Sequence, residues 1–327
     1  MSSLSQTIAQ QHAVIPEWKL HYYDPHPPAR LEELNDRARK AFWVPKEVRT
    51  EIVTDIGQWN TKLDKSERRF ISLILAYFTT ADSILDDFIA RELIPAARHQ
   101  VARMFWRFQV GIEDIHAETY MMFLEAYPIP ESKKEKYRSA MESVSVIKQK
   151  IEWYRQPRAT DLPEKLVIQA CAEMIQFSAS LCGPIEFSHN RKLLPALGQA
   201  IRLIVRDEGC HGEFACEYLR IVGLPNLEWL HQTVRECVDL EMQFVDYILK
   251  TPLIGLTADS MKQYVRYVAD RMLGMMGLQA IYGDANPYDW MLTVGSASKT
   301  SLHDRHPTEY QTVSKADMEE DAFADFN

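Results

Sequence analysis

The sequence has little glycine and no paired cysteines, and each shortage excludes a class of fold. Only 12 of the 327 residues are glycine, and turn signals are sparse across the middle of the chain, which favours long helices over many short strands. The five cysteines are scattered and odd in number, with no CxxC pair. We therefore expect reduced thiols in a cytoplasmic protein, rather than a disulfide framework or a zinc site.

Long apolar runs and an excess of positive charge are also missing. No run approaches the ~20 apolar residues that cross a bilayer, and residues 1–6 lack the charged and apolar regions of a signal peptide. The formal net charge of -9 argues against the backbone of a nucleic acid as the main partner. We expect no membrane and no nucleic-acid partner, and the hydrophobic content of 46% is ample for a core.

The apolar residues that are present recur at helical spacing, which predicts an all-α chain. Residues 1–30 contain four prolines and no sustained period, so we expect an N-terminal arm. The predicted helices cover about 31–43, 66–92, 101–126, a lysine-rich outer helix at 131–153, 164–181, 193–222, 227–249 and 258–282, with breaks at Pro95 and at Gly183-Pro184. Residues 31–292 form the predicted helical domain, and the polar residues 293–327 form a mobile tail.

One predicted helix, residues 101–126, carries polar side chains on a stripe that is otherwise apolar. Glu113 and His116 are three residues apart, and Tyr120 lies four further on, so all three share one helix face. Buried polar groups need partners, and a metal ion satisfies a carboxylate and an imidazole together. The stretch therefore indicates a metal site.

The Glu-x-x-His pattern occurs four times, beginning at Glu113, Glu186, Glu208 and Glu228. The Glu186 copy lies between two prolines, which suggests a solvated connection. The Glu228 copy lies in the first turn of a predicted helix, where the helix dipole favours Glu. Only the Glu113 and Glu208 copies lie in mid-helix within an apolar frame, so these two define the predicted metal site.

Each of these two pairs is preceded, one helix earlier, by a single acid. Asp82 lies 31 residues before Glu113, and Glu173 lies 35 residues before Glu208. A lone mid-helix acid or histidine is more often a structural residue, but six unpaired ionisable side chains in one core would be very costly. Oxygen ligands with two imidazoles suit iron or manganese better than zinc, copper or calcium. The predicted ligands of a two-metal site are Asp82, Glu113, His116, Glu173, Glu208 and His211.

These six residues in this order, together with Tyr120, resemble the small, radical-generating subunit of class I ribonucleotide reductases, in the ferritin-like superfamily. The resemblance implies a ferritin-like helical bundle with additional helices, usually a homodimer, and two iron ions in an Fe–O–Fe centre; manganese or a mixed manganese–iron pair is the alternative. Asp82, Glu113 and His116 would bind one ion and the other three ligands the second, with Glu113 and Glu208 as bridges. The chain departs from the expected ligand set in one place, because its first helix supplies the aspartate Asp82 and not a glutamate.

The resemblance gives Tyr120 the role of the stable tyrosyl radical. Residues that resemble the apolar pocket around that radical are Phe177, Leu181 and Ile204. Such a pocket has a physical reason, because an oxidised phenol survives only where water and reductants are excluded. We therefore expect Tyr120 to be buried beside the metal site.

Radical transfer to a partner needs a chain of redox-active or hydrogen-bonded groups. The family pattern places its start at Trp43 and continues it through Asp207 and His116. It ends at a tyrosine of the tail, which resembles Tyr310. A metal-bound imidazole commonly donates its other N–H to a carboxylate, so contact between His116 and Asp207 is expected on physical grounds as well.

The acidic last residues, with Phe323 and Phe326, resemble the tail that holds the family's large, catalytic subunit, and aromatic side chains of such tails can order in a partner's groove. The resemblance implies the small subunit of a ribonucleoside-diphosphate reductase, in which two reduced metals react with O2, Tyr120 is oxidised, and the large subunit converts ribonucleotides to deoxyribonucleotides. Two alternatives would share the six ligands: a ferritin-like dimetal oxidase that binds an apolar ligand, and an iron-storage protein without radical transfer. Neither explains Tyr120, Trp43 and a tail with Tyr310 together.

Overall fold

The computed structural model describes residues 24–155, 158–292 and 294, and within these ranges the chain is built from helices. A single isolated β-bridge joins Leu253 to Leu256 in the described part. The main helices are α3 (Ala29–Lys40), α4 (Ile52–Thr61), α5 (Lys65–Phe88), α7 (Gln100–Ala126), α8 (Glu131–Arg138), α9 (Ala140–Ser143), α10 (Ser145–Arg155), α11 (Leu162–Ala170), α12 (Ser178–His189), α13 (Pro195–Val222), α14 (Leu227–Ile248) and α15 (Ala258–Met275). The all-α prediction is confirmed.

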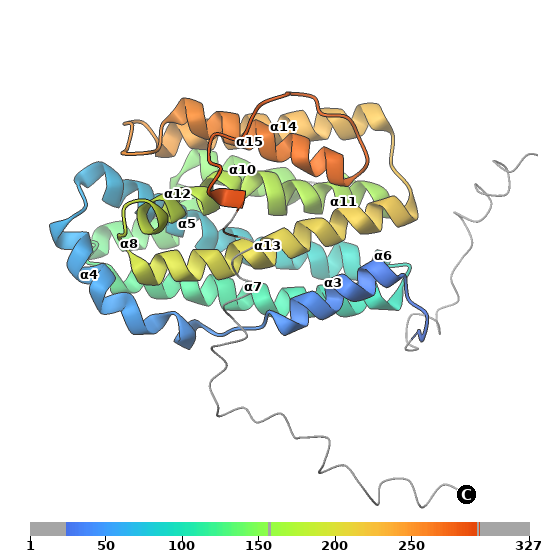
Figure 1. Cartoon of the computed structure of the whole chain (residues 1–327), viewed down its shortest axis with the longest axis horizontal. Coiled ribbons are helices and arrows are strands. Elements are labelled where there is room, and N and C mark those ends of the chain that lie inside the picture. The colour runs from blue at the N-terminus through green and yellow to red at the C-terminus, as the bar shows by residue number, and fades with distance from the viewer. Residues whose placement is uncertain (1–23, 156–157, 293, 295–327) are drawn as a thin grey trace, which may run out of the picture.

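The helices that carry the predicted ligands form the centre of the bundle. Figure 1 shows α7 and α13 running through it with α3 alongside, and α14 with α15 along the opposite edge. Helix α5 packs on α7, and α11 and α12 pack on α13. Two helix pairs therefore face one another across the core, as the repeated acid and Glu-x-x-His units predicted.

Two π-helical segments interrupt the central helices, and the sequence reading missed both. Ile89–Leu93 (η3) joins α5 to the short α6 (Ile94–Ala96), so the helix ends one residue after Pro95, where a break was predicted. Cys171–Gln176 (η4) joins α11 to α12 and contains Glu173. Each segment turns the following residues relative to a regular α-helix, and such segments are frequent at functional sites.

The break predicted at Gly183-Pro184 was wrong, because α12 runs through both residues to His189. A Cβ at position 183 would lie 2.4 Å from the ring of Phe70, so glycine here permits close helix packing. Glu186, predicted to lie in a solvated connection, is buried in α12 and accepts a hydrogen bond from Asn190. Close packing overrides the local turn signal.

The predicted outer helix at 131–153 is three helices, α8 to α10, and it is not wholly outer. Lys150 is fully buried, with its Nζ 2.5 Å from Glu241 and 2.8 Å from the Gln176 carbonyl oxygen. The same ammonium lies over the rings of Tyr77 and Phe244. The lysine-rich composition hid this one inward-facing position.

The segment Leu162–His189 is long and apolar enough to cross a membrane, but 94% of the relevant window is buried inside the protein. This burial explains its composition, because a central helix of a bundle is apolar on all sides. It bears Glu173 and is part of the core.

Helix α13 begins without a cap from its own chain segment, and α4, which the sequence reading did not predict, supplies one. Leu194 precedes α13 in a left-handed conformation with φ of 52°. The buried Asp55 carboxylate of α4 accepts hydrogen bonds from the backbone N–H groups of Ala196 (3.0 Å) and Leu197 (2.9 Å) and from the Tyr127 hydroxyl (3.0 Å). This cap fixes the start of the helix that carries Glu208 and His211.

We expect Asp55→Ala to lower the free energy of unfolding by about 2–4 kcal/mol, because it removes a cap and leaves buried donors without an acceptor. Asp55→Asn, which keeps one acceptor oxygen, should lose less. Denaturant titration measures both, with the exposed Asp87→Ala as a control expected within ±0.5 kcal/mol of the unmodified chain. An Asp55→Ala variant as stable as the control would contradict the capping role.

Candidate metal centre

Six ionisable side chains from four helical segments meet in the interior of the bundle. Their exposed fractions are all 2% or less, and they form two overlapping groups that share Glu113. In each group, one potential ligand atom per residue lies within 4.8 Å of every other. The groups are Asp82, Glu113 and His116, and Glu113, Glu173, Glu208 and His211.

Two carboxylates link the two imidazoles at the centre of this cluster. Glu113 approaches Nδ1 of His116 with Oε2 (2.9 Å) and Nδ1 of His211 with Oε1 (3.0 Å). Glu208 repeats the arrangement, with Oε1 3.1 Å from His116 and Oε2 2.8 Å from His211. Both Nδ1 atoms therefore face the centre, and both glutamates reach both halves of the site.

Several carboxylate oxygens of the cluster lack the hydrogen-bond donors that buried oxygens need. Among the described residues, neither oxygen of Asp82 has a hydrogen-bond partner, and neither does Oε2 of Glu173. Buried carboxylate oxygens without donors are costly unless a cation occupies the space between them. Oxygen and imidazole ligands in this number fit a two-metal site.

Burial and the neighbouring charges shift the pKa values of these groups in the directions that favour bound protons where metal ions do not balance the charge. Burial raises the pKa of Asp82 and of Glu173 well above the usual carboxyl range, and neighbouring carboxylates raise both further. Burial alone would lower the pKa of His116 and His211, but Glu113 and Glu208 raise both pKa values well above normal. Burial opposes ionisation of Glu113 too, yet the two imidazoles hold its pKa far below normal. Metal ions must displace these protons, so binding should release them.

Tyr120 lies one turn beyond His116 on α7 and is fully buried. Its ring stacks on Phe78 at 4.4 Å with an interplanar angle of 6°, and Phe177 meets Phe78 edge-on at 5.2 Å. Its hydroxyl has no hydrogen-bond partner in the described chain. Burial, with a further contribution from the Asp82 charge, raises the pKa of the phenol well above its usual value.

The predicted pocket residues Phe177, Leu181 and Ile204 are all buried. Ring contacts place Phe177 in the aromatic group around Tyr120. Phe78, which stacks directly on Tyr120, was not predicted as a pocket residue. Its only sequence signal is its place in the apolar period of α5.

Trp43, Asp207 and His116 lie together, as the resemblance implied. The Trp43 indole donates its Nε1–H to Oδ2 of Asp207 at 2.7 Å, and that oxygen lies 3.3 Å from Nε2 of His116. The indole and imidazole rings also stack at 5.9 Å. Arg206 donates to the other oxygen of Asp207 and to the Ala41 carbonyl, which ties the segment before Trp43 to α13.

Two glutamines lie beside the cluster, one in direct contact with it and one behind the first, and neither was predicted from the sequence. Gln109 donates from Nε2 to Glu173 and to Glu113, while Gln169 contacts Gln109. Gln109 lies four residues before Glu113, and Gln169 lies four residues before Glu173. Residues four apart share a helix face, and this spacing is the one sequence feature that could have predicted their position.

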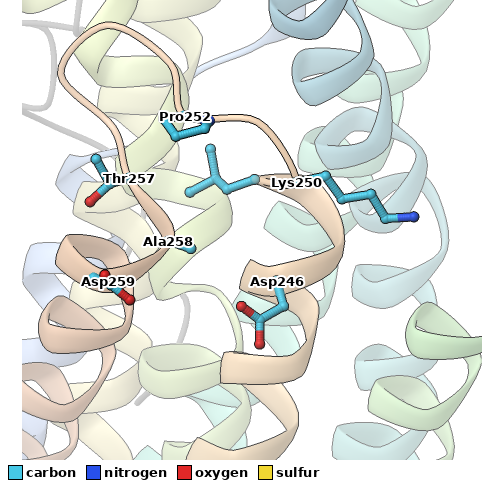
Figure 2. Close-up of a pocket in the computed structure, with 7 residues that line it drawn as sticks. Asp246, Lys250, Pro252, Thr257, Ala258 and Asp259 are labelled. Carbon is cyan, nitrogen blue, oxygen red and sulfur yellow. The ribbon is translucent and has the colours of Figure 1, made fainter.

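Three predicted functional residues, Tyr310, Phe323 and Phe326, lie outside the described residues, as do residues 1–23 of the predicted arm. A surface hollow at the connection between α14 and α15 is shown in Figure 2; it is lined by Asp246, Leu249, Lys250, Pro252, Thr257, Ala258 and Asp259. None of the predicted site residues lines it.

Comparison with known proteins agrees with this geometry. Residues 23–287 match the family model described as ribonucleotide reductase, small chain. The chain is 36% identical over 288 residues to a ribonucleoside-diphosphate reductase small chain of Arabidopsis thaliana, covering 86% of this chain and 82% of the relative. It is 31% identical over 308 residues to the small chain of vaccinia virus strain Western Reserve, covering 93% of each.

Solved structures support the fold. The ribonucleotide reductase Rnr4 homodimer of Saccharomyces cerevisiae aligns over 92% of this chain and 99% of its own, with a TM-score of 0.74 and 20% identity. A putative class I ribonucleotide reductase of Bacillus halodurans aligns over 82% of this chain and all of its own, with a TM-score of 0.72 and 19% identity. At these identities the likeness shows the ferritin-like fold alone.

The family match selects among the functions that the six residues allow. It supports the reductase small subunit over the ligand-binding oxidase and the storage protein, and a small subunit implies a large-subunit partner. The described cluster of carboxylates and imidazoles fits the dimetal site of such a subunit. The chain therefore belongs to the ribonucleotide reductase small chain family and is the small subunit of a ribonucleoside-diphosphate reductase.

Proposed function

We propose that the six clustered side chains hold two metal ions that generate a radical on Tyr120. Asp82, Glu113 and His116 bind one ion, and Glu173, Glu208 and His211 bind the other. Glu113 and Glu208 would contact both ions, which is supported by the contact of each glutamate with both imidazoles. The observation that carries the proposal is the convergence of these six side chains, away from solvent, beside a buried tyrosine.

We propose iron as the metal, with two ions that these six side chains would hold. Carboxylate oxygens and imidazole nitrogens suit iron and manganese alike. One protein of similar fold, the dimanganese(II)-NrdF of Streptococcus sanguinis, is a manganese form. Manganese and a mixed manganese–iron pair are thus the alternatives at this site.

When bound beside Tyr120, two reduced metal ions would supply, with O2, the oxidising power to take one electron from the phenol. The protein's part is to exclude water and reductants. Burial raises the pKa of Tyr120, which favours the neutral phenol as the group that is oxidised. Stacking on Phe78 keeps the oxidised ring in an apolar environment.

The route from this site toward the large subunit runs through His116, Asp207 and Trp43. Asp207 is held between Arg206 and Trp43 and faces His116 with the oxygen that accepts the indole N–H. This arrangement connects the cluster to the Trp43 ring through short contacts. Phe42, the residue before Trp43, is 56% exposed. The chain therefore reaches the surface next to the buried Trp43.

The C-terminal tail has two parts in the proposed function. Tyr310 carries the radical onward, and Phe323 and Phe326 anchor the tail in a groove of the large subunit. The small subunit acts as a homodimer in the cytoplasm, and the five buried free cysteines are compatible with a reducing compartment. Nucleotide substrate and allosteric sites belong to the large subunit.

Tyr120→Phe should abolish the organic radical. Metal-free protein given Fe(II) and O2 should show a tyrosyl signal by electron paramagnetic resonance, and the variant should show none. Tyr77→Phe is the matched control, because Tyr77 is also buried and its hydroxyl also lacks a partner in the described chain. A tyrosyl signal that survives Tyr120→Phe and vanishes in Tyr77→Phe would contradict the assignment.

Trp43→Phe should leave the tyrosyl radical in place but lower turnover with the large subunit on the order of 10- to 100-fold, because Asp207 loses its indole donor. Steady-state deoxyribonucleotide formation, normalised to radical content, measures the effect. Trp59→Phe alters a buried tryptophan that stacks on Tyr127 and should retain turnover. Equal rates in the two variants would remove Trp43 from the route.

Deletion of residues 318–327 should abolish turnover while the radical yield stays unchanged, because the anchors are lost and the metal centre is intact. Turnover and the radical signal are measured on the same preparation. Phe323→Ala and Phe326→Ala should each weaken binding to the large subunit in a pull-down. Full turnover by the truncated chain would rule out docking through the tail.

A further inference from the structure

We infer that Trp106, Gln169 and Gln109 form a buried hydrogen-bonded relay of fixed direction that positions the carboxylates of Glu173 and Glu113. The three are positioning residues for the metal centre. The inference rests on the proposed function, in which these carboxylates bind metal ions.

The relay is a continuous chain of side-chain contacts between two helical segments. The Trp106 indole donates Nε1–H to Oε1 of Gln169 at 3.1 Å, and Nε2 of Gln169 donates to Oε1 of Gln109 at 3.0 Å. Nε2 of Gln109 then donates to Glu173 at 2.5 Å and to Glu113 at 3.2 Å. Trp106, Gln169 and Gln109 are all fully buried.

The two ends of the relay impose the same direction on both amides. An indole N–H can only donate, so the Gln169 amide must present its oxygen to Trp106 and its nitrogen to Gln109. The Gln109 amide must then accept with its oxygen and donate with its nitrogen. A carboxylate that binds a metal ion is ionised and can only accept, so in the metal-bound site the far end requires the same orientation. A reversed amide would leave buried groups unpaired, at about 1–3 kcal/mol for each group.

The relay acts differently on the two oxygens of Glu173. Gln109 donates to Oε1, while Oε2 has no hydrogen-bond partner among the described residues. The amide therefore occupies one oxygen and leaves the other for a cation. Because the same NH2 group also reaches Glu113, it sets the spacing between ligands from α7 and from η4.

The relay also spans the irregular backbone of η4. Gln169 lies in α11 and Glu173 in the π-helical segment that follows. Gln109 on α7 contacts both, so it locks the position of Glu173 across that segment. Burial of an amide does not by itself produce such contacts, because Gln176, also buried, has neither its nitrogen nor its oxygen paired in the described chain.

Manganese titration of the metal-free full-length chain tests the relay, with free Mn(II) followed by electron paramagnetic resonance. We expect Gln109→Leu to weaken binding of at least one of the two ions by about 10- to 100-fold. Gln169→Leu and Trp106→Phe should weaken it less, in that order. Packing alone predicts the reverse order, because Trp106→Phe removes the most buried volume.

A double-variant cycle gives the decisive comparison. If Trp106 acts through Gln109, Trp106→Phe should change Mn(II) affinity in the unmodified chain and have no further effect in the Gln109→Leu background. Additive effects would overturn the relay, as would wild-type affinity in Gln109→Leu. Should Trp106→Phe fail to fold, the same cycle between Gln169→Leu and Gln109→Leu carries the test.

Two matched controls separate the relay from the loss of buried polar groups. Trp153→Phe removes a buried indole whose N–H has no partner in the described chain, and Gln176→Leu removes the unpaired buried amide. Both should bind Mn(II) as the unmodified chain does; a loss equal to that of the relay variants would overturn the inference. An unmodified chain that fails to bind two ions would instead contradict the proposed function, so the two failures are distinguishable.

Discussion

The structure depends on a concentration of charge that water cannot reach. Four carboxylates and two imidazoles lie within contact distance in a bundle where each is at most 2% exposed. Such a group is stable only if protons or metal ions balance it, and the raised pKa values of Asp82, Glu173 and His116 are in the direction that favours bound protons. The surrounding apolar residues keep water away from the site, and the proposed radical on Tyr120 would depend on the same exclusion of water. Stability and reactivity thus have one source.

Polar groups outside the cluster fix the positions of its charged side chains. On one side, Arg206 and Trp43 hold Asp207 against His116. On the other, two amides and an indole hold Glu173 and Glu113. The cap that Asp55 provides for α13 secures the helix between them. Ligands from separate helices are therefore fixed by contacts that cross between helices, and not by helix propensity alone.

The sequence predicted the helices and the six-residue cluster because both depend on spacing along one helix face. Residues three or four apart share a helix face whatever the rest of the fold does, so Glu113, His116 and Tyr120 could be placed together without coordinates. The π-helical turn that contains Glu173, the continuation of α12 through Pro184 and the burial of Lys150 could not be predicted. Each is decided by packing between helices distant in sequence, which no local pattern encodes. Phe78 and Gln109 have the right period but an ordinary residue type, so only their neighbours reveal their roles.

The buried ion pair of Lys150 and Glu241 lies beside Tyr77, a second buried tyrosine near Tyr120. Tyr77 and Tyr120 are both fully buried, and Phe78 contacts both rings. The Lys150 ammonium lies 3.8 Å from the centre of the Tyr77 ring, and a positive charge so close makes removal of an electron from that ring harder. In the proposed function, this ammonium would favour a radical on Tyr120 over one on Tyr77.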